Sequence, residues 1–394
     1  MEVVCYAAAM PSILLKPGKE RRLLAGHAWV YAGEIAKLTG AVPDGGAVDI
    51  RDHKERFLGR GLLNRQSQIS VRRFTMNKEE IDRLFFRRRI TAANAYRSGD
   101  TYRVVFSEGD QLPGLIVDRF GDVLVLQALT LGIDQRKPII LEVLRDLFHP
   151  AAIVERSDVP SRKLEGLTET KGVLAGKLEG KTQITVGGVQ FELDLLEDQK
   201  TGFFLDQAEN YVTVAKYCAG KRVLDCFSYH GGFALFAGKA GAKTVEAVEI
   251  SEPAIARAHV NAELNGLSGK IEFRCVNAFD MLKKSDADKR QFDMIILDPP
   301  TFTRTKQNVD AALRGYKEIN LRALKMLAPG GMLATFSCSH HVPLALLRSV
   351  VVEAAADAHR TMRLVKTLTQ AADHPILPAI PETEYLNGLL LQAV

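Results

Sequence analysis

The sequence lacks the features that mark several large classes of protein. Its 394 residues contain no unbroken apolar run of about 18 to 20 residues, the length that a membrane span requires. The five cysteines are widely spaced and form no Cys-x-x-Cys pair, which argues against a disulfide framework and a structural zinc site. The first residues do not have the basic start and apolar core of a secretory signal. We therefore expect a soluble, cytosolic protein with no membrane partner and no metal.

The composition is that of a globular chain, but the charge is unevenly distributed. Hydrophobic residues make up 46% and charged residues 25% of the sequence. Residues 1–100 hold 18 Lys and Arg against 11 Asp and Glu, whereas the rest of the chain holds 34 against 36. This asymmetry is compatible with an anionic macromolecular partner held by the first hundred residues, and equally with a solvated charged surface.

The pattern of apolar runs changes twice along the chain. Residues 11–76 have the short runs and turn signals of a β-rich module, and residues 77–190 mix strands with helices, beginning with a helix over Glu79–Asn94. From about residue 195 strands and helices alternate. The predicted strands are Arg222–Asp225, Thr244–Glu249, Ile271–Val276, Met294–Asp298, Met332–Ser337 and a last hairpin around Leu364 and Leu386–Leu391. The predicted helices are Gly232–Ala240, Pro253–Leu264, Leu313–Leu327 and Pro343–His359. This alternation predicts a doubly wound, mostly parallel α/β domain.

Two short sequences that follow predicted strands carry candidate chemistry. Asp298-Pro299-Pro300-Thr301-Phe302 combines a carboxylate with rigid and aromatic neighbours, which suits a flat, stacked substrate. Ser337-Cys338-Ser339 follows the next strand and offers a thiol. Because ligands collect at the carboxyl ends of strands in open α/β sheets, the pair indicates chemistry on a nucleobase.

A glycine-bearing loop between a strand and a helix predicts a cofactor site. The sequence Asp225–Phe233 does not fit the Gly-x-Gly-x-x-Gly pyrophosphate fingerprint, so a dinucleotide is disfavoured. Glu249, with Ile250, ends the next strand, where an acid commonly binds the hydroxyls of a ribose. Asn277, Ala278 and Phe279 follow the third strand, where a polar side chain can meet an adenine. Together these positions predict S-adenosylmethionine. The cofactor-binding candidates in this part of the chain are Asp225, Phe227, Ser228, Tyr229, Gly231, Gly232, Phe233, Glu249, Ile250, Asn277, Ala278, Phe279 and Asp298.

Longer strings give the chain a close resemblance to a known family. They are His27–Tyr31, Asn64–Arg73, Glu108–Arg119, Arg156–Asp158, Lys200–Gln207, Asp298–Phe302, Arg314–Lys317 and Ser337–His341, besides the cofactor loop. On these strings the chain resembles, nearly from end to end, the RlmI-like family of bacterial 23S rRNA (cytosine-C5) methyltransferases. It departs from the family pattern at Arg65, Ala208 and His230, where Pro, Arg and Thr are usual.

The resemblance implies three domains and a nucleic-acid partner. We expect a PUA-like RNA-binding domain over residues 1–76, a small central α+β domain over residues 77–190, and a Rossmann-like, class I S-adenosylmethionine-dependent methyltransferase domain over residues 191–394. The implied partner is 23S rRNA or a large-subunit assembly intermediate, and a homodimer is compatible with the resemblance. By the same resemblance, Lys200, Thr201, Phe204 and Gln207 join the cofactor-binding candidates.

The implied mechanism divides the work between the two reactive loops. Cys338 would add to cytosine C6 as the nucleophile, which activates C5 toward the methyl donor. Asp298 would hold the base edge, while the two prolines shape the pocket wall. The substrate-binding candidates are Pro299, Pro300, Phe302, Arg72 and Arg73, the two arginines as RNA phosphate contacts on the first module.

Two other functions remain open at this point. A methyltransferase acting on an exocyclic amino group or on guanine N7 would use the Asp298 loop without a cysteine. An RNA-binding assembly factor with an inactive catalytic domain would not bind S-adenosylmethionine.

Overall fold

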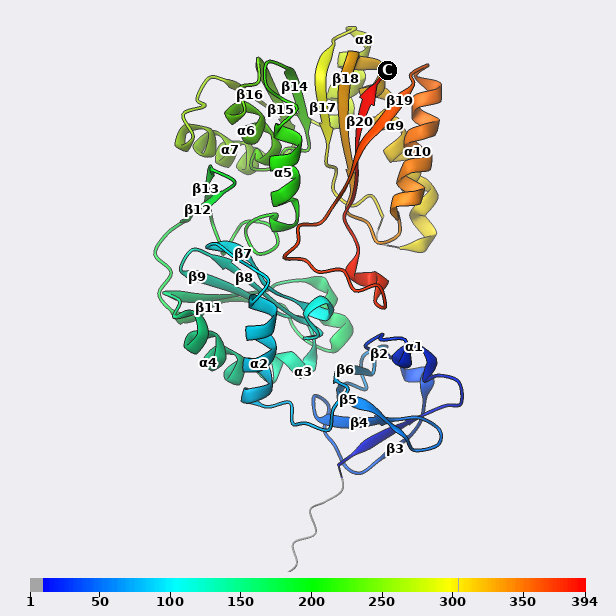
Figure 1. The fold of residues 1–394 in the computed structure, drawn as a ribbon. Coiled ribbons are helices and arrows are strands. Elements are labelled where there is room, and N and C mark those ends of the chain that lie inside the picture. The colour runs from blue at the N-terminus through cyan, green and yellow to red at the C-terminus, as the bar shows by residue number, and fades with distance from the viewer. Residues whose placement is uncertain (1–9, 304) are drawn as a thin grey trace, which may run out of the picture. The chain divides into compact units, whose positions relative to one another are not determined.

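The computed structural model describes residues 10–303 and 305–394 and divides the chain into two compact units (Figure 1). Unit 1 contains residues 1–182, 194–203 and 373–383, and unit 2 contains residues 183–193, 204–372 and 384–394. Each unit is therefore assembled from segments far apart in the sequence. The division into three domains stays a prediction, since its first two parts both lie in unit 1.

The first module of unit 1 is a six-stranded sheet. Its strands are β1 (Ser12–Leu15), β2 (Trp29–Val30), β3 (Ile35–Thr39), β4 (Ala47–Arg51), β5 (Phe57–Leu63) and β6 (Val71–Thr75), in the order β2-β6-β5-β4-β1-β3. The short helix α1 (Arg21–Leu24) lies between β1 and β2. Apolar residues from all but one of these strands form its small core, with Leu23 of α1. The β-rich character predicted for residues 11–76 is confirmed.

The second part of unit 1 is a five-stranded sheet with helices packed on it. Its strands are β7 (Thr101–Phe106), β8 (Leu115–Phe120), β9 (Val123–Ala128), β10 (Ala152–Ser157) and β11 (Thr170–Gly176), and its helices are α2 (Arg83–Asn94), α3 (Leu131–Asp134) and α4 (Lys137–Phe148). Helix α2 begins later than predicted because the Asp82 carboxylate caps it, accepting a hydrogen bond from the Phe85 amide at 2.9 Å. Phe85, Phe86 and Ile90 bury the inner face of this helix in the core.

Unit 2 is built on a seven-stranded sheet in the order β16-β15-β14-β17-β18-β20-β19. Its strands are β14 (Arg222–Cys226), β15 (Thr244–Glu249), β16 (Ile271–Cys275), β17 (Phe292–Leu297), β18 (Leu327–Ser337), β19 (Met362–Thr369) and β20 (Asn387–Ala393). Strands β14 to β18 are parallel, and β20 is antiparallel to both of its neighbours. A separate two-stranded sheet is formed by β12 (Thr182–Val186) and β13 (Val189–Leu193).

Helices cover both faces of this sheet, as the doubly wound prediction requires (Figure 1). They are α5 (Ala208–Ala215), α6 (Gly232–Lys239), α7 (Glu252–Leu264), α8 (Ala278–Ala287), α9 (Val309–Met326) and α10 (Leu344–Asp357). Helices α8, α9 and α10 share one apolar core with Leu224, Ile295 and Leu333 of the strands. On the opposite face, Phe233 of α6 packs against Phe336 of β18. The predicted Rossmann-like domain is confirmed, while α5 and α8 were not predicted.

The sheet brings several strand ends to one edge. Strands β14, β15, β16, β17 and β18 run in the same direction, so the loops that follow Cys226, Glu249, Cys275, Leu297 and Ser337 all leave from that edge. The sequence motifs assigned to cofactor or substrate in this unit after residue 220 lie in these loops or in the strand ends and first helical turns that border them. Within the described residues, no helix is both long and apolar enough to cross a membrane.

Candidate active site

The two loops with candidate chemistry lie against each other. Strands β17 and β18 are parallel neighbours, with Leu297 paired to Thr335. Their register places the two loops side by side, so that the Cys338 thiol points to the carbonyl oxygen of Pro299 at 3.9 Å. Cys338 is partly exposed, whereas Cys218 and Cys226 are buried. A nucleophile must reach its substrate, so accessibility distinguishes Cys338 from the two buried thiols of this unit.

Gln207 holds the Asp298 carboxylate. The Gln207 side-chain amide donates a hydrogen bond to Asp298 Oδ2 at 2.9 Å, and its own oxygen accepts one from Asn210 at 2.7 Å. Asn210 also donates to the carbonyl oxygen of Thr369 at 2.9 Å. Gln207, predicted as a cofactor contact, therefore has a role in orienting the candidate base-holding residue. Its contact with the cofactor stays a prediction.

Phe302, the aromatic residue of the Asp298 loop, packs against other aromatic side chains of the protein. The Phe302 ring lies 4.6 Å from the Tyr316 ring and 5.7 Å from the Phe279 ring, between centroids. A Cβ atom at Gly315 would come within 3.2 Å of the same ring, so glycine permits this close approach. Pro299 is buried and Pro300 is exposed. Pro299 and Phe302 are therefore packed against the protein, whereas Pro300 is exposed to solvent.

The cofactor loop has an unusual backbone. Phe227, Tyr229 and Gly231 have φ angles of 66°, 48° and 84°, and two of these three residues carry a Cβ atom that disfavours such angles. A backbone of this kind persists where the surrounding structure imposes it, commonly at ligand sites. Gly231 is the N-cap of α6, so the loop also exposes amide donors at a helix N-terminus.

Buried polar atoms around this loop fit a cationic ligand. Asp225 Oδ2 accepts a hydrogen bond from the Ala234 amide, but Asp225 Oδ1 and Ser228 Oγ are buried without a hydrogen-bond partner. Burial raises the pKa of Asp225 well above its usual value, and the charges of Asp298 and Glu249 raise it further. Three carboxylates so arranged repel one another, and S-adenosylmethionine carries positive charge on its sulfonium and ammonium groups. The residues present therefore fit this cofactor.

Glu249 links two of the strand-end loops. One oxygen of its carboxylate accepts hydrogen bonds from the Ile250 and Ser251 amides at 2.8 and 2.9 Å, and the other accepts one from the Tyr229 amide at 3.1 Å. The acid is thus fixed at the end of β15, where a ribose contact is predicted. Ile250 is exposed.

Several other candidates have structural roles. Asn277 Oδ1 caps α8 by accepting a hydrogen bond from the Phe279 amide, and Ala278 is buried in the first turn of that helix. Phe233 packs in the core against Tyr211, and a Cβ atom at Gly232 would come within 2.8 Å of that tyrosine ring. Their predicted contacts with the cofactor stay predictions.

The Lys200–Gln207 segment is shared between the two units. Lys200 and Thr201 belong to unit 1, where the fully buried Thr201 hydroxyl donates a hydrogen bond to Asp118 at 2.6 Å. Phe204 and Gln207 belong to unit 2, where the Phe204 ring packs edge-on to Tyr229 at 5.3 Å between centroids. Each half of this segment thus has its own partners. The cofactor role of Lys200, Thr201 and Phe204 remains a prediction.

The arginines predicted to contact RNA have partners within unit 1. Arg72 forms an ion pair with the buried Glu165 at 2.9 Å. Arg73 is 9% exposed and donates hydrogen bonds to the carbonyl oxygens of Leu23 and Leu58. Both guanidinium groups are held by these partners, and their contact with RNA stays a prediction. The sequence places both arginines on a strand but does not show which groups they contact.

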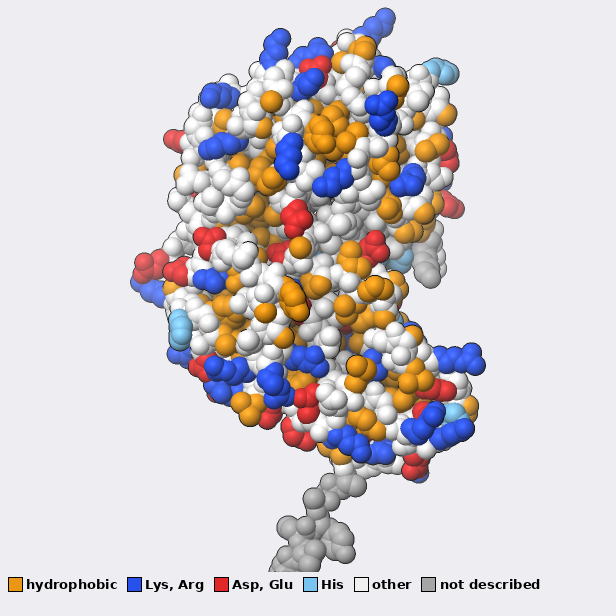
Figure 2. Space-filling model, viewed as in Figure 1, with side chains coloured by type: hydrophobic (Ala, Val, Ile, Leu, Met, Phe, Trp, Pro, Cys, Tyr) orange, Lys and Arg blue, Asp and Glu red, His pale blue; other side chains and the backbone are white. Residues whose placement is uncertain are grey.

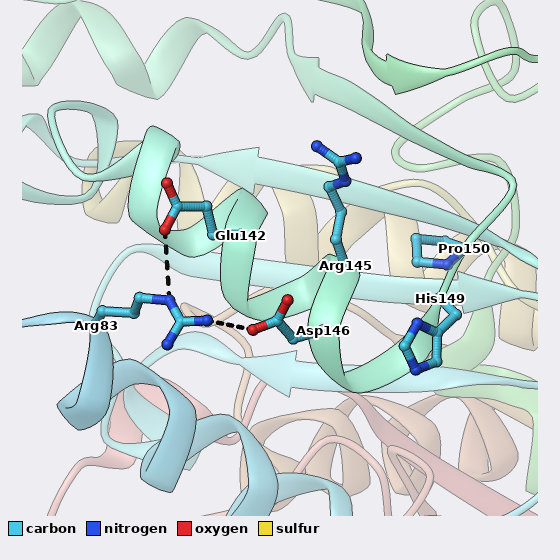
Figure 3. Close-up of a pocket in the computed structure, with 6 residues that line it drawn as sticks. All are labelled: Arg83, Glu142, Arg145, Asp146, His149 and Pro150. Atoms are coloured by element: carbon cyan, nitrogen blue, oxygen red, sulfur yellow. Dashed lines mark hydrogen bonds and ion pairs between the residues drawn. The ribbon is translucent and has the colours of Figure 1, made fainter.

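The arginine-rich helix α2 is likewise paired with acids. In a pocket between α2 and α4, Arg83 forms ion pairs with Glu142 and Asp146 (Figure 3). Arg87 shares Asp146, and Arg88 pairs with Glu79. A solvated, salt-bridged helix face is therefore the better interpretation of this stretch.

One candidate residue escaped the sequence argument. Tyr316 lies within the Arg314–Lys317 string yet had no assigned role, because a tyrosine in an amphipathic helix ordinarily belongs to the core. The structure buries it completely on α9, in contact with Phe302. Burial raises the pKa of Tyr316, hydrogen bonding with the Ser337 side chain and the Phe302 backbone lowers it, and the charges of Cys338 and Asp298 raise it further.

Comparison with known proteins identifies the family. Residues 13–76 match the model of a PUA-like domain, and residues 168–391 match that of the S-adenosylmethionine-dependent methyltransferases. A protein of Shewanella denitrificans named ribosomal RNA large subunit methyltransferase I is 43% identical, with 96% of this chain and 98% of that protein covered. The chain belongs to the ribosomal RNA large subunit methyltransferase I family. A Klebsiella pneumoniae protein of the same name is 40% identical, with 96% of this chain and 97% of that protein covered.

Solved structures support the fold of this family member. A Streptococcus mutans protein described as a SAM-dependent methyltransferase has a TM-score of 0.82 at 18% identity, covering 97% of this chain and 99% of that one. A methyltransferase in complex with SAH has a TM-score of 0.84 at 19% identity and the same coverage. The match to the family model makes this chain an S-adenosylmethionine-dependent methyltransferase, as the cofactor loop predicted.

Proposed function

We propose that this chain methylates ribosomal RNA of the large subunit, forming 5-methylcytosine in 23S rRNA through a covalent adduct between Cys338 and cytosine C6. The substrate class follows the names of the relatives. The observation that carries the chemistry is the position of the Cys338 thiol, directed at Pro299 of the Asp298 loop at 3.9 Å. A nucleophile and a base-holding carboxylate on adjacent loops are what C5 chemistry requires.

The reaction balances with the groups at hand. The Cys338 thiolate would form a bond to C6, and the electron pair displaced onto C5 would attack the methyl group of bound S-adenosylmethionine, whose methyl–sulfur bond breaks with its electron pair staying on sulfur, so that S-adenosylhomocysteine leaves. A base then removes the C5 proton, the C5–C6 double bond re-forms, and the thiolate leaves. Splitting one difficult displacement into addition and elimination lowers the barrier of each step. The cytosine must be unpaired or flipped out of its helix to enter the site.

Asp298 positions the base and Arg314 binds the backbone in this proposal. Gln207 fixes one oxygen of Asp298, and in this proposal the carboxyl group of Asp298 holds the ring nitrogen or amino group of cytosine. Arg314 is exposed on α9, and it has no acidic partner among the described residues, unlike Arg72. Its exposed cation can contact a phosphate of the RNA backbone.

Replacing the nucleophile tests the proposal. We expect Cys338→Ser to lower methyl transfer to large-subunit rRNA by at least about a thousandfold, because a hydroxyl does not form the C6 adduct readily. RNA containing 5-fluorocytosine should form a denaturation-resistant complex with the wild type and none with the variant, since fluorine blocks proton removal. Cys218→Ser is the matched control, because that buried thiol only donates to the Val214 carbonyl oxygen.

The same experiment separates the alternatives. Full methyl transfer by Cys338→Ser would assign the activity to an exocyclic amino group or to guanine N7 and reject the C5 mechanism. Absence of S-adenosylmethionine binding by calorimetry would indicate an assembly factor with an inactive catalytic domain. The strained loop and the unpartnered Asp225 oxygen argue against that second alternative.

A further inference from the structure

A groove lies at the edge of the unit 2 sheet opposite the reactive loops. It has a volume of about 810 Å³, and its lining residues begin strands β14, β15, β16 and β17 or belong to the helix ends and turns that precede these strands. The cofactor and substrate candidates lie at the other end of the same parallel strands (Figure 1). Strands of five or six residues span about 17 to 20 Å, so the groove is separate from the candidate active site.

More cations than acids line this groove. The cations are Arg222, Lys243, Lys270 and Arg290, and the acids are Glu246 and Glu272. Each of the four strands begins with, or closely follows, one of these cations. Because the strands are parallel neighbours, their starts meet at one edge of the sheet. The cluster of charge therefore comes from the topology and not from a run of basic residues in the sequence.

Two arginines already neutralise the two acids. Arg290 forms an ion pair with the buried Glu246 at 2.6 Å, and Arg274 pairs with the other oxygen of that carboxylate at 3.0 Å. Arg274 also pairs with Glu272 at 2.8 Å. The charges of these four residues cancel, so the net charge of the groove comes from its other cations.

The two lysines have no such compensation. Lys243 and Lys270 are exposed, and neither has an acidic partner among the described residues. Arg222, by contrast, is paired with Asp293 at 2.9 Å. The lysines directly precede β15 and β16, which are adjacent strands, so their two positive charges lie at neighbouring strand starts. Like charges so placed repel each other, and a polyanion that lies across both relieves this repulsion.

We propose that this groove binds the RNA backbone through phosphate contacts of Lys243 and Lys270, at a distance from the target nucleotide. The inference rests on the substrate class of the proposed function, RNA, and not on the C5 chemistry. Both lysines lie at the exposed rim, which suits an extended chain of phosphates better than a small enclosed anion. Lysine is a flexible point charge that contacts phosphates without reading sequence, so the groove adds affinity and orients the RNA.

Removing both lysines tests this site. We expect Lys243→Gln combined with Lys270→Gln, in the full chain, to lower the salt slope of binding to transcribed 23S rRNA by about 1.5 units, since each lost phosphate contact removes about 0.7 to 0.9. The KM for this RNA should rise about tenfold, while kcat and the dissociation constant of S-adenosylmethionine stay unchanged. Filter binding at several salt concentrations, initial rates and calorimetry measure these quantities.

A second pair of cations at the far end of the sheet provides the matched control. Arg363 and Lys366 are exposed on β19, and neither forms an ion pair within the part of the chain that the structure describes. Arg363→Gln combined with Lys366→Gln removes the same net charge, and we expect it to leave the salt slope and the KM unchanged. Equal losses from both pairs would overturn the inference, because RNA binding would then follow the total charge of the protein.

Reversing the charge of the groove extends the test. Lys243→Glu combined with Lys270→Glu should weaken RNA binding more than the glutamine variant does, because it adds repulsion to the loss of contact. Unchanged RNA binding in both variants would overturn the inference and leave these lysines as solvated surface residues. Absence of methyl transfer to 23S rRNA by the wild type would overturn the proposed function, whereas the binding measurements would still decide the inference.

Discussion

Two buried carboxylates, one in each unit, differ in their partners. In unit 1, Asp118 receives two hydrogen bonds from Arg103, at 2.7 and 2.8 Å, and a third from Thr201. In unit 2, Asp225 Oδ1 is buried without a hydrogen-bond partner. A buried carboxylate with a full set of hydrogen bonds stabilises the fold. A buried carboxylate oxygen without a partner reduces stability and marks a place where a ligand can supply the partner.

The same contrast separates Arg72 and Arg73, which have partners within unit 1, from Arg314, which has no acidic partner among the described residues. Arg72 and Arg73 were predicted to bind RNA because they lie on the basic first module, yet each has internal partners. Lys and Arg side chains are scattered over the face of the molecule seen in Figure 2 and interspersed with acids. Local charge density is therefore a weaker guide to a nucleic-acid contact than the absence of an internal partner.

Removing the buried carboxylate of Asp118, which is paired with Arg103, should have the largest effect on stability. Asp118→Ala leaves the buried Arg103 without its carboxylate, and we expect the free energy of unfolding to fall by about 3 to 5 kcal/mol. Urea denaturation followed by circular dichroism measures this change. Asp293→Ala is the control, since it removes a partly exposed pair with Arg222 and should cost about 1 kcal/mol or less. Equal losses in the two variants would contradict the comparison.

Replacing Asp225, whose buried Oδ1 has no hydrogen-bond partner, should weaken cofactor binding without lowering the stability of the fold. We expect Asp225→Asn to unfold at the same urea concentration as the wild type or a higher one, because it relieves the repulsion with Asp298 and Glu249. S-adenosylmethionine should bind about tenfold more weakly, as measured by calorimetry. The exposed Asp288→Asn should change neither quantity.

The pH dependence of the ligand-free protein sharpens this prediction. The folded pKa of Asp225 is raised, so the native state holds a proton that the unfolded state has lost. Stability from this group therefore increases as the pH falls from the raised pKa toward the unfolded value of about 3.9. Asp225→Asn should lack this gain. An identical pH dependence in both proteins would show that Asp225 is not the buried acid responsible.

The smallest expected effects come from replacing Arg314, which has no acidic partner among the described residues, and Arg72, which is paired with Glu165. Arg314→Ala should change the free energy of unfolding by less than about 0.5 kcal/mol and reduce the salt dependence of RNA binding by about one unit of slope. Arg72→Ala should destabilise the fold, since it leaves Glu165 buried without its cation, while the salt slope stays the same. Filter binding at several salt concentrations compares the two, and a lower slope for Arg72→Ala would restore its RNA role.

Much of the fold was predictable because its signals are local. The strand–helix alternation after residue 195 reflects the apolar periodicity of each segment, and the structure has the predicted strands and helices within a few residues. Helix α8 was missed because Asn277 was interpreted as an adenine contact, whereas its side chain caps that helix. A cap and a ligand contact use the same residue types, so the sequence alone does not separate them.

The site was predictable only in part, since its pairings join distant segments. Cys338 and Asp298 follow adjacent parallel strands, and their loops were expected to be neighbours on topology alone. The contact between Gln207 and Asp298 spans 91 residues, and nothing local in either segment indicates it. The packing of Tyr316 on Phe302 depends in the same way on how α9 packs against the sheet.

The sequence by itself determined the family, the cofactor class and the order of strands and helices, because motifs and periodicity are properties of contiguous residues. Only the tertiary structure decided which polar groups are satisfied and which are left for chemistry, because a partner is chosen by the packing of segments far apart in the chain. It shows that Arg72 and Arg73 have partners within unit 1. It also packs Tyr316 against Phe302 of the Asp298 loop.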